Sequence, residues 1–387
     1  MRFMFVVPPF AGHVNPTVAV AAALAERGHE AVWCGPPEIL DLLPLGARLF
    51  ATADSPGAPG GYARLHARWQ RLRGVGALRF LVEETLVPLA HTMLPGVAAA
   101  VAGYRPDVVV ADQQTFAGAF VAVKAGVPWA TSATTSAEFT RPLVGFPKID
   151  DWVRTRIAEA AVAAGVPGDC DPRFSPRLVL VFSTPELVGL TDPVPAHHCY
   201  VGPAFGRRPA TVDFPWDRLD PERRHVLISL GTLNRDAGDR FYPAVVAATR
   251  PLADRLQLIL AAPERLAGAP AEHVLVREFV PQLALLPHLD AVVTHGGHNT
   301  VCEALAFGLP LVLAPIRDDQ PIVARQVVAA GAGVRVRFGR AHVPELRLAV
   351  TDALDRPELR AGAARIRASF AAAGGADAAA ERLEKLC

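Results

Sequence analysis

The sequence predicts an α/β protein of two domains, each built on a parallel β-sheet. Short apolar runs alternate with helix-compatible segments along the chain, a pattern typical of strands buried on both faces. The alternation stops in the breaker-rich stretch Gly206–Pro221 and then starts again. Because 387 residues exceed what one hydrophobic core usually supports, we expect two domains with a ligand cleft between them.

Composition favours a small molecule as the binding partner. A formal net charge of +1 offers no basic surface for nucleic acid or an anionic membrane. The five cysteines include no CxxC pair, so neither a zinc site nor a disulfide framework is indicated. No apolar run approaches the roughly 18 residues of a membrane span, and the N-terminus lacks a signal-peptide cleavage region. We therefore expect a cytoplasmic monomer or homodimer without a membrane span.

The first domain is predicted to begin as a βαβ unit. Phe3–Val7 is an apolar strand, Asn15 is expected to cap a helix that Pro16 opens, and Glu30–Cys34 forms the next strand. His13 then lies in the loop after the first strand. Open α/β sheets bind their ligands at this edge, which makes His13 a candidate site residue.

Asp112 is a second candidate at the same edge of the first sheet. It ends the apolar strand Pro106–Asp112 and precedes a helix predicted over Phe116–Lys124. Since the carboxyl ends of parallel strands share one sheet edge, we expect Asp112 and His13 to meet. The alternative is that Asp112 only caps the helix and that His13 is an ordinary loop residue.

The second domain is predicted to repeat the pattern of strands and helices. Its first strand, His225–Leu230, runs into a turn at Gly231 and Thr232, and the alanine-rich segment Arg356–Leu386 is predicted to be helical at the end of the chain. Further strands are expected at Pro128–Ala130 in the first domain and at Leu256–Ala261, Val274–Val276, Ala291–Thr294 and Leu311–Ala314 in the second.

The strongest binding signal is the turn that follows the strand Ala291–Thr294. It reads His295-Gly296-Gly297-His298-Asn299-Thr300 and leads into a helix, whose N-terminus presents backbone N–H groups and a positive dipole to an anion such as phosphate. We expect Asn299 or Thr300 to cap this helix. Glu303 shares a helix face with Asn299 and would repel phosphate, so sugar hydroxyls are its expected ligand. The alternative is a plain glycine turn.

The stretch Phe279–Gln320 resembles the nucleotide-sugar signature of the family 1 glycosyltransferases. An aromatic-x-Pro-Gln opens it at Phe279–Gln282, His-x-Gly-x-Asn-(Ser/Thr) follows at His295–Thr300, and Glu303 and Asp319-Gln320 complete it. The resemblance implies the GT-B fold, with two facing Rossmann-like domains, an interdomain cleft and a C-terminal helix that crosses back to the first domain. The implied boundaries are an acceptor-binding domain at 1–206 with 372–387 packing back, a linker at 207–221 and a nucleotide-sugar-binding domain at 222–371.

The resemblance further implies an inverting bacterial enzyme of natural-product and antibiotic biosynthesis. It would move a hexose or deoxyhexose from a TDP-, UDP- or, less commonly, GDP-sugar to a hydroxyl of an apolar acceptor, without a metal or cofactor. By the resemblance His13 is the general base, and Asp112 orients its ring. The implied donor-binding residues are Ser229, Gly231, Thr232, Phe279, Val280, Gln282, His295, Gly296, Gly297, His298, Asn299, Thr300, Glu303, Asp319 and Gln320.

Asp169-Cys170-Asp171 spells the DxD motif of metal-dependent glycosyltransferases. No strand precedes it to present both carboxylates to a metal, so we expect a surface turn.

The sequence is compatible with more than one donor base and more than one function. Phe279 stands where plant members stack the base on Trp, which leaves uracil, thymine and guanine as candidates. A nucleotide-sugar 2-epimerase of the same architecture and a catalytically silent nucleotide-sugar-binding partner are alternatives, although the pair His13 and Asp112 argues against the silent protein. An NAD-dependent oxidoreductase is disfavoured because no GxGxxG follows the first strand. The acceptor region, Asp54–Pro147, is too weakly patterned to identify the acceptor.

Overall fold

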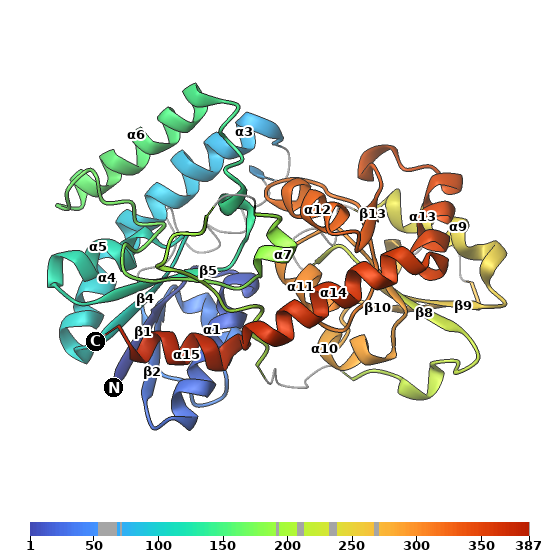
Figure 1. The fold of residues 1–387 in the computed structure, drawn as a ribbon, viewed down its shortest axis with the longest axis horizontal. Helices are drawn as coiled ribbons and strands as arrows, with labels where there is room; N and C mark the ends of the chain where they lie inside the picture. Colours follow the sequence, from blue (N-terminus) through green and yellow to red (C-terminus); the bar gives the residue numbers. More distant parts are fainter. Residues whose placement is uncertain are drawn as a thin grey trace. The chain divides into compact units, whose positions relative to one another are not determined.

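The protein consists of two compact α/β units, shown in a computed structural model (Figure 1). The structure describes residues 1–52, 68–69, 72–190, 193–206, 213–231, 238–266 and 271–386. The first unit comprises Met1–Thr184, Leu190–Arg208 and Ala373–Cys387, and the second comprises Pro185–Gly189 and Pro209–Ala372. Pro185–Gly189, which the expected boundary assigns to the first domain, thus belongs to the second unit.

The first unit is built on a sheet with strand order β3-β2-β1-β4-β5-β6-β7, all neighbours being parallel. Side chains alternate across it: Phe3 and Phe5 pack towards one layer of helices, and Met4 and Val6 towards the other. The elements in the described residues are β1 (Arg2–Val6), α1 (Ala11–Glu26), β2 (Glu30–Gly35), β3 (Leu49–Ala51), α3 (Gly74–Arg79), the π-helix η2 (Phe80–Leu86), α4 (Val87–Tyr104), β4 (Val108–Asp112), α5 (Phe116–Ala125), β5 (Trp129–Ala133), α6 (Pro147–Ala163), β6 (Val179–Val181), β7 (His198–Tyr200) and α15 (Gly375–Glu384).

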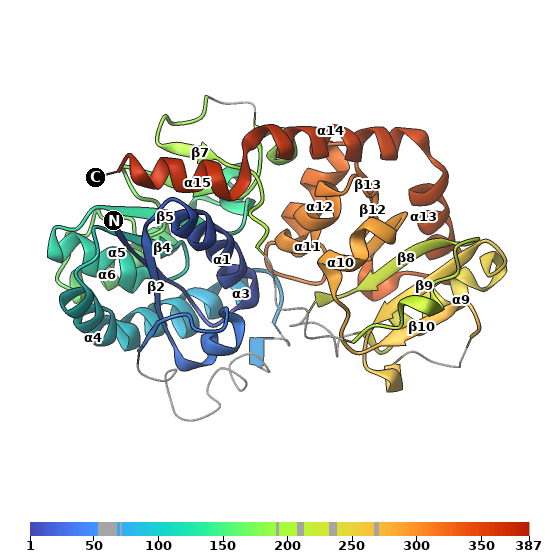
Figure 2. The ribbon, with the colours of Figure 1, turned by 90° about the horizontal axis from the view of Figure 1, so that it is seen from below.

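The second unit carries a parallel sheet in the order β10-β9-β8-β11-β12-β13, and Figure 2 shows β9 and β10 beside β8. Of the expected linker, 213–221 is described and includes a short helical turn at Trp216–Arg218, whereas 207–212 lies outside the described residues. The elements are α7 (Pro185–Val188), β8 (Arg224–Ser229), α9 (Phe241–Thr249), β9 (Leu256–Ala261), β10 (Val274–Arg277), α10 (Gln282–Leu285), β11 (Ala291–Thr294), α11 (His298–Ala306), β12 (Leu311–Leu313), α12 (Gln320–Ala329), β13 (Gly333–Arg335), α13 (Val343–Asp355) and α14 (Pro357–Ala373).

Helix α1 begins earlier than the sequence predicts. It starts at Ala11, so the prediction that Asn15 caps the helix is wrong and Pro16 lies inside the helix. Proline removes one backbone donor, which would have bonded to the carbonyl four residues earlier. The early start has a consequence for the site, because it places His13 on the first turn of a helix rather than in a loop.

One helical stretch is long and apolar enough to cross a membrane by length and composition. It runs from Gly74 to Tyr104, with a mean hydropathy of 1.5 in its best window, and departs from the expectation that the chain has no such segment. Its residues Leu89, Met93 and Val97 are fully or almost fully buried in the core of the first unit, beside β1 and β4. A helix buried in a protein core can also have this length and mean hydropathy.

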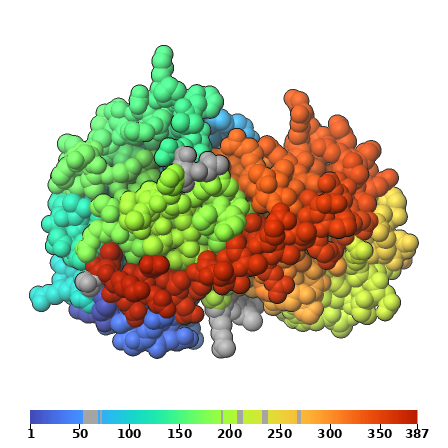
Figure 3. All heavy atoms as spheres, viewed as in Figure 1, coloured from blue at the N-terminus to red at the C-terminus, as the bar shows by residue number. Residues whose placement is uncertain are grey.

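The chain returns to the first unit at its C-terminus. Gly374 and Gly375 have φ of 86° and 58°, and this left-handed turn separates α14 from α15, where a single helical segment is predicted. Helix α15 then packs on α1 through Ala380 and Leu383, both fully buried. Figure 3 shows the C-terminal residues, in red, against the blue and green surface of the first unit.

Polar contacts at the end of α15 make a pH-dependent contribution to its packing on the first unit. His29 Nε2 lies 2.8 Å from a Glu384 carboxylate oxygen, and Arg27 lies 3.3 Å from the other oxygen. The hydrogen bond from His29, more than the nearby positive charges, lowers the pKa of Glu384. Its stabilisation is therefore present above the ordinary glutamate pKa of 4.5 and is lost as the pH falls through the lower folded-state pKa.

We expect Glu384→Gln to lower Tm at neutral pH and to have no effect in acid. The amide cannot ionise, so variant and parent should converge as the pH falls below about 4.5, the ordinary value that the folded protein depresses. Thermal unfolding followed by circular dichroism over pH 3–8 measures the difference. Glu345→Gln, at an exposed position on α13, is the control. A difference in Tm that stays constant across this range would contradict the assignment.

Candidate active site

In both parallel sheets the order of the strands reverses at a point where polar side chains gather. In the first sheet β1 and β4 are neighbours although they are not consecutive, and in the second β8 and β11 stand in the same relation, with Ser229 opposite Thr294. The connections leave such a pair towards opposite sides, which opens a crevice outside the carboxyl ends of the strands. His13 and Asp112 lie at the first of these points, and Ser229 and His295 at the second.

The structure brings His13 and Asp112 into direct contact. His13 Nδ1 lies 3.0 and 2.9 Å from the two carboxylate oxygens of Asp112. The Asp112 side chain is fully buried, whereas that of His13 keeps 17% of its surface exposed. An ionised carboxylate only accepts hydrogen bonds, so Nδ1 carries the proton and Nε2 is the basic nitrogen of the neutral ring.

Further donors hold the buried carboxylate. The backbone N–H of Gln114 donates to Asp112 Oδ1 at 2.9 Å, and the hydroxyl of Thr134 donates to Oδ2 at 3.0 Å. Thr134, which the sequence analysis passes over, directly follows β5, the neighbour of β4 in the sheet. These bonds offset the cost of burying a negative charge.

The predicted phosphate-binding turn is a strand–glycine–helix junction in the second unit. Gly296 has φ of 86°, and α11 begins at His298 with Gly297 as its N-cap residue. The prediction that Asn299 or Thr300 caps the helix is therefore wrong, because Gly297 takes the extended backbone of the cap position. Asn299 and Thr300 lie within the first turn, half-buried, where the N–H groups point along the helix axis.

The imidazole of His295 fills the space between two glycine loops. A Cβ atom at Gly231 would lie 2.7 Å from its Cε1, and one at Gly297 would lie 2.5 Å from its Nε2. Burial lowers the pKa of His295 to about 4, while a hydrogen bond to the Ser229 backbone opposes this shift and the charge of Arg317 adds to it. His295 is therefore neutral at physiological pH and acts as a spacer that fits only beside residues without a side chain.

Residues from the start and the middle of the stretch Phe279–Gln320 are in contact. Gln282, the first residue of α10, donates through Nε2 to a carboxylate oxygen of Glu303 at 2.5 Å. Glu303 is 2% exposed, so its carboxylate is buried beside this amide. Phe279 is half-exposed, and Val280 is half-buried. His298 is buried with its ring nitrogen 3.5 Å from Cys302 Sγ, a thiol whose pKa burial raises.

The end of the signature is a tight loop before α12. Gln320 is buried, and its Oε1 accepts the backbone N–H groups of Ile316 and Arg317 at 2.9 and 3.1 Å. Asp319 precedes α12 and is half-buried. Arg317, which the sequence analysis does not single out, is a 6% exposed guanidinium whose charge reaches His295. Of the expected turn after β8, Ser229 and Gly231 are placed, and Thr232 lies outside the described residues.

The motif that resembles a metal site is a turn closed by an ion pair. Asp171 binds the guanidinium of Arg173 at 2.7 Å and accepts the Arg173 backbone N–H at 3.0 Å, as expected of a surface turn. In the described part of the chain no three His, Cys, Asp or Glu side chains are grouped as metal ligands would be.

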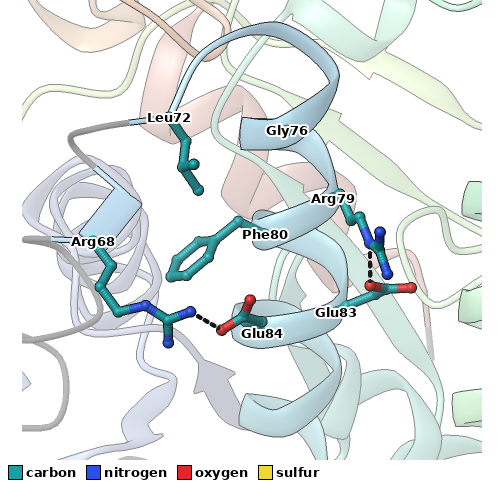
Figure 4. Close-up of a pocket in the computed structure, with 7 residues that line it drawn as sticks. All are labelled: Arg68, Leu72, Gly76, Arg79, Phe80, Glu83 and Glu84. Carbon is teal, nitrogen blue, oxygen red and sulfur yellow. Dashed lines mark hydrogen bonds and ion pairs between the residues drawn. The ribbon is translucent and has the colours of Figure 1, made fainter.

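A pocket of about 430 Å³ opens beside η2 in the first unit (Figure 4). The guanidinium of Arg68 lies 5.2 Å from the Phe80 ring centroid and 2.8 Å from Glu84, and Arg79 pairs with Glu83 at 2.8 Å. The four charged side chains that line the pocket therefore form two ion pairs, and the Arg68–Glu84 pair lies beside the Phe80 ring. The pocket falls within the region where we expect the acceptor, but neither His13 nor Asp112 lines it.

Fold and site together define a two-unit glycosyltransferase, and comparison with known proteins names the family. Residues 258–386 match the family described as Erythromycin biosynthesis protein CIII-like, C-terminal domain. The chain is 32% identical to the 4'-demethylrebeccamycin synthase of Lentzea aerocolonigenes, with 96% of both chains covered, and 30% identical to the demethyllactenocin mycarosyltransferase of Streptomyces fradiae, with 99% of this chain and 86% of that one covered. It belongs to the bacterial natural-product glycosyltransferases of family 1.

Solved structures agree with this fold. The glycosyltransferase of kitacinnamycin aligns with a TM-score of 0.80 at 25% identity, over 100% of this chain and 98% of that one. VinC, solved in complex with dTDP, aligns with a TM-score of 0.78 at 21% identity, over 100% and 99%. The predicted fold class, GT-B, and the prediction of a glycosyltransferase are confirmed.

Proposed function

We propose that this glycosyltransferase moves a hexose or deoxyhexose from a TDP- or UDP-sugar to a hydroxyl group of an apolar natural product, with inversion and without a metal ion. The observation that carries the proposal is the hydrogen-bonded pair of His13 and a fully buried Asp112 at the carboxyl edge of the first sheet. A partly exposed imidazole held by a buried carboxylate is the arrangement that a general base requires.

The pair supports a single proton transfer. With the proton of the neutral ring on Nδ1, Nε2 takes the proton of the acceptor hydroxyl as its oxygen attacks the anomeric carbon. The bond from that carbon to the nucleoside diphosphate breaks on the opposite face, so the configuration inverts. Asp112 stabilises the imidazolium that forms, and no covalent enzyme intermediate is needed.

The second unit supports the departure of the diphosphate. N–H groups on the first turn of α11 and the dipole of that helix offer fixed positive potential to the negative charge that grows on the leaving group. The buried guanidinium of Arg317, which also pairs with Asp318 at 3.5 Å, acts on His295 and is proposed to add positive potential to this site. Glu303 and Asp319 are proposed to bind hydroxyl groups of the donor, and Phe279 to stack on its base.

The names of the relatives support both UDP- and TDP-sugars as donors, since two relatives from Bacillus subtilis are named UDP-glucosyltransferases. The demethyllactenocin mycarosyltransferase is named for a mycarosyl transfer, and VinC was solved with dTDP. Phe279 leaves the base itself undetermined from the residues alone. The acceptor is proposed to be an apolar natural product, because the relatives are named for rebeccamycin and lactenocin compounds.

A donor panel tests the proposal. TDP-, UDP- and GDP-sugars are incubated with the enzyme and a macrolide or an aromatic acceptor, with and without EDTA, and products are followed by mass spectrometry. We expect transfer from TDP- or UDP-sugars at the same rate in both conditions, because the leaving group is stabilised by N–H groups and Arg317. A rate that collapses with EDTA and returns with added Mg²⁺ would overturn the metal-free mechanism, and product of retained configuration would exclude inversion.

A further inference from the structure

Thr134 joins His13 and Asp112 in a closed three-residue arrangement. Its Oγ1 lies 2.8 Å from His13 Nδ1 and 3.0 Å from Asp112 Oδ2, and the residue is 4% exposed. His13 lies on α1 after β1, Asp112 is the last residue of β4, and Thr134 directly follows β5; the three strands are adjacent in the sheet. The sheet therefore fixes all three relative to one another.

One assignment of protons satisfies every distance in this arrangement. The Thr134 hydroxyl donates its proton to Asp112 Oδ2, which as a carboxylate oxygen only accepts. A lone pair of Thr134 Oγ1 then faces the N–H of His13 Nδ1, which is shared between that oxygen and the carboxylate. The imidazole proton is thus held by oxygens of two residues rather than one.

Three threonines in helices of the described structure show how a hydroxyl bonds to the backbone, although Thr17 also accepts from Trp33 Nε1 and Thr249 lies 3.3 Å from His273 Nε2. Thr17, Thr140 and Thr249 each donate to a backbone carbonyl three or four residues earlier. In the described structure the Thr134 hydroxyl makes its hydrogen bonds to His13 and Asp112 instead. Its contacts serve the reacting pair and not the backbone.

We infer that Thr134 is a positioning residue, which keeps the proton of His13 on Nδ1 and stops the ring from rotating away from Asp112. The inference rests on the proposed role of His13 as the base. A ring with two oxygen partners at Nδ1 keeps Nε2 unprotonated and aimed in one direction, whereas a ring with one partner has more freedom. Thr134 acts through His13 and is not assigned a contact with either substrate.

Two variants of Thr134 test the inference in the full-length enzyme. Thr134→Val keeps the shape and removes the hydroxyl, and Thr134→Ser keeps the hydroxyl. We expect Thr134→Val to lower kcat by about 10- to 100-fold, the size of one lost hydrogen bond to a charged group, and Thr134→Ser to stay within about threefold of the parent. The KM for the donor sugar and the affinity for TDP alone, from calorimetry, should not change. Thr155→Val, which removes an exposed hydroxyl bound to a backbone carbonyl on α6, outside the expected acceptor region, is the control.

The outcomes separate this inference from the function on which it rests. Parental kcat in Thr134→Val, an equal loss in Thr134→Ser, or a rise in donor KM that matches the fall in kcat would each overturn the positioning role. His13→Ala is measured in parallel. If that variant is inactive while Thr134→Val behaves like the parent, only the inference about Thr134 fails; if His13→Ala keeps full activity, the proposed base fails as well.

Discussion

Replacing His13 with alanine is expected to lower kcat by about 10²- to 10⁴-fold, the range that a positioned general base contributes. The acceptor hydroxyl would have to lose its proton to water, while the donor pocket in the second unit keeps all its residues. The affinity for TDP should therefore stay at the parental value. Steady-state kinetics at saturating donor and calorimetric titration with TDP measure the two quantities separately.

A surface histidine of the same unit is the matched control for this variant. His91 is exposed on α4, and His91→Ala should retain parental activity. Asp112→Asn should also reduce kcat, because an amide at this position can donate to His13 Nδ1 and so favour the wrong tautomer. Activity of His13→Ala within a few-fold of the parent, with unchanged TDP affinity, would remove His13 from the mechanism.

The pairing of His13 with Asp112 could be predicted from the sequence because both follow apolar runs. Runs such as Val108–Val110, buried on both faces, identify parallel strands, and parallel strands place their carboxyl ends at one edge. The position of each candidate residue relative to the end of its strand then determines which side chains lie in contact. What the sequence did not reveal is that His13 belongs to α1, since Pro16 is a strong signal for a helix start and here stands inside the helix.

Thr134 was missed because β5 was predicted to end too early. The sequence predicts a strand only to Ala130, while the strand continues through Thr131 and Ser132 to Ala133. These polar residues are fully or almost fully buried and pair with β4 and β6. Tertiary packing therefore places them in the strand despite their polar side chains. With the strand extended, the next residue falls at the same sheet edge as Asp112.

Arg317 and the cap of α11 were missed for a related reason. Arginine is rarely buried, so composition alone places Arg317 in a solvated loop, whereas it is 6% exposed beside the neutral His295. Asparagine is a strong N-cap residue, so the pattern favours Asn299 over glycine. Both errors lie within the stretch that resembles the nucleotide-sugar signature, where the local structure departs from average residue preferences.

A single methyl group at Gly297 is expected to weaken donor binding by about 10- to 100-fold, which corresponds to the roughly 1–3 kcal/mol that overpacking typically costs. Gly297 has φ of −61°, so its backbone accepts alanine without strain, and the clash with His295 adds to the smaller cost of replacing glycine at the N-cap of α11. The added Cβ would lie 2.5 Å from His295 Nε2 and 2.8 Å from Cε1. The ring cannot yield freely, because Gly231 crowds the same edge, so the phosphate-binding turn must shift.

Removing the ring tests whether this contact is the cause. In a His295→Ala background the methyl group of Gly297→Ala meets no imidazole, so its additional cost in TDP affinity should be small, and the two substitutions should be strongly non-additive. Gly339→Ala is the control in the same unit, since a Cβ there meets nothing within 4 Å. Fully additive losses would show that Gly297 acts apart from His295. A loss confined to acceptor KM would contradict the assignment of this turn to the donor.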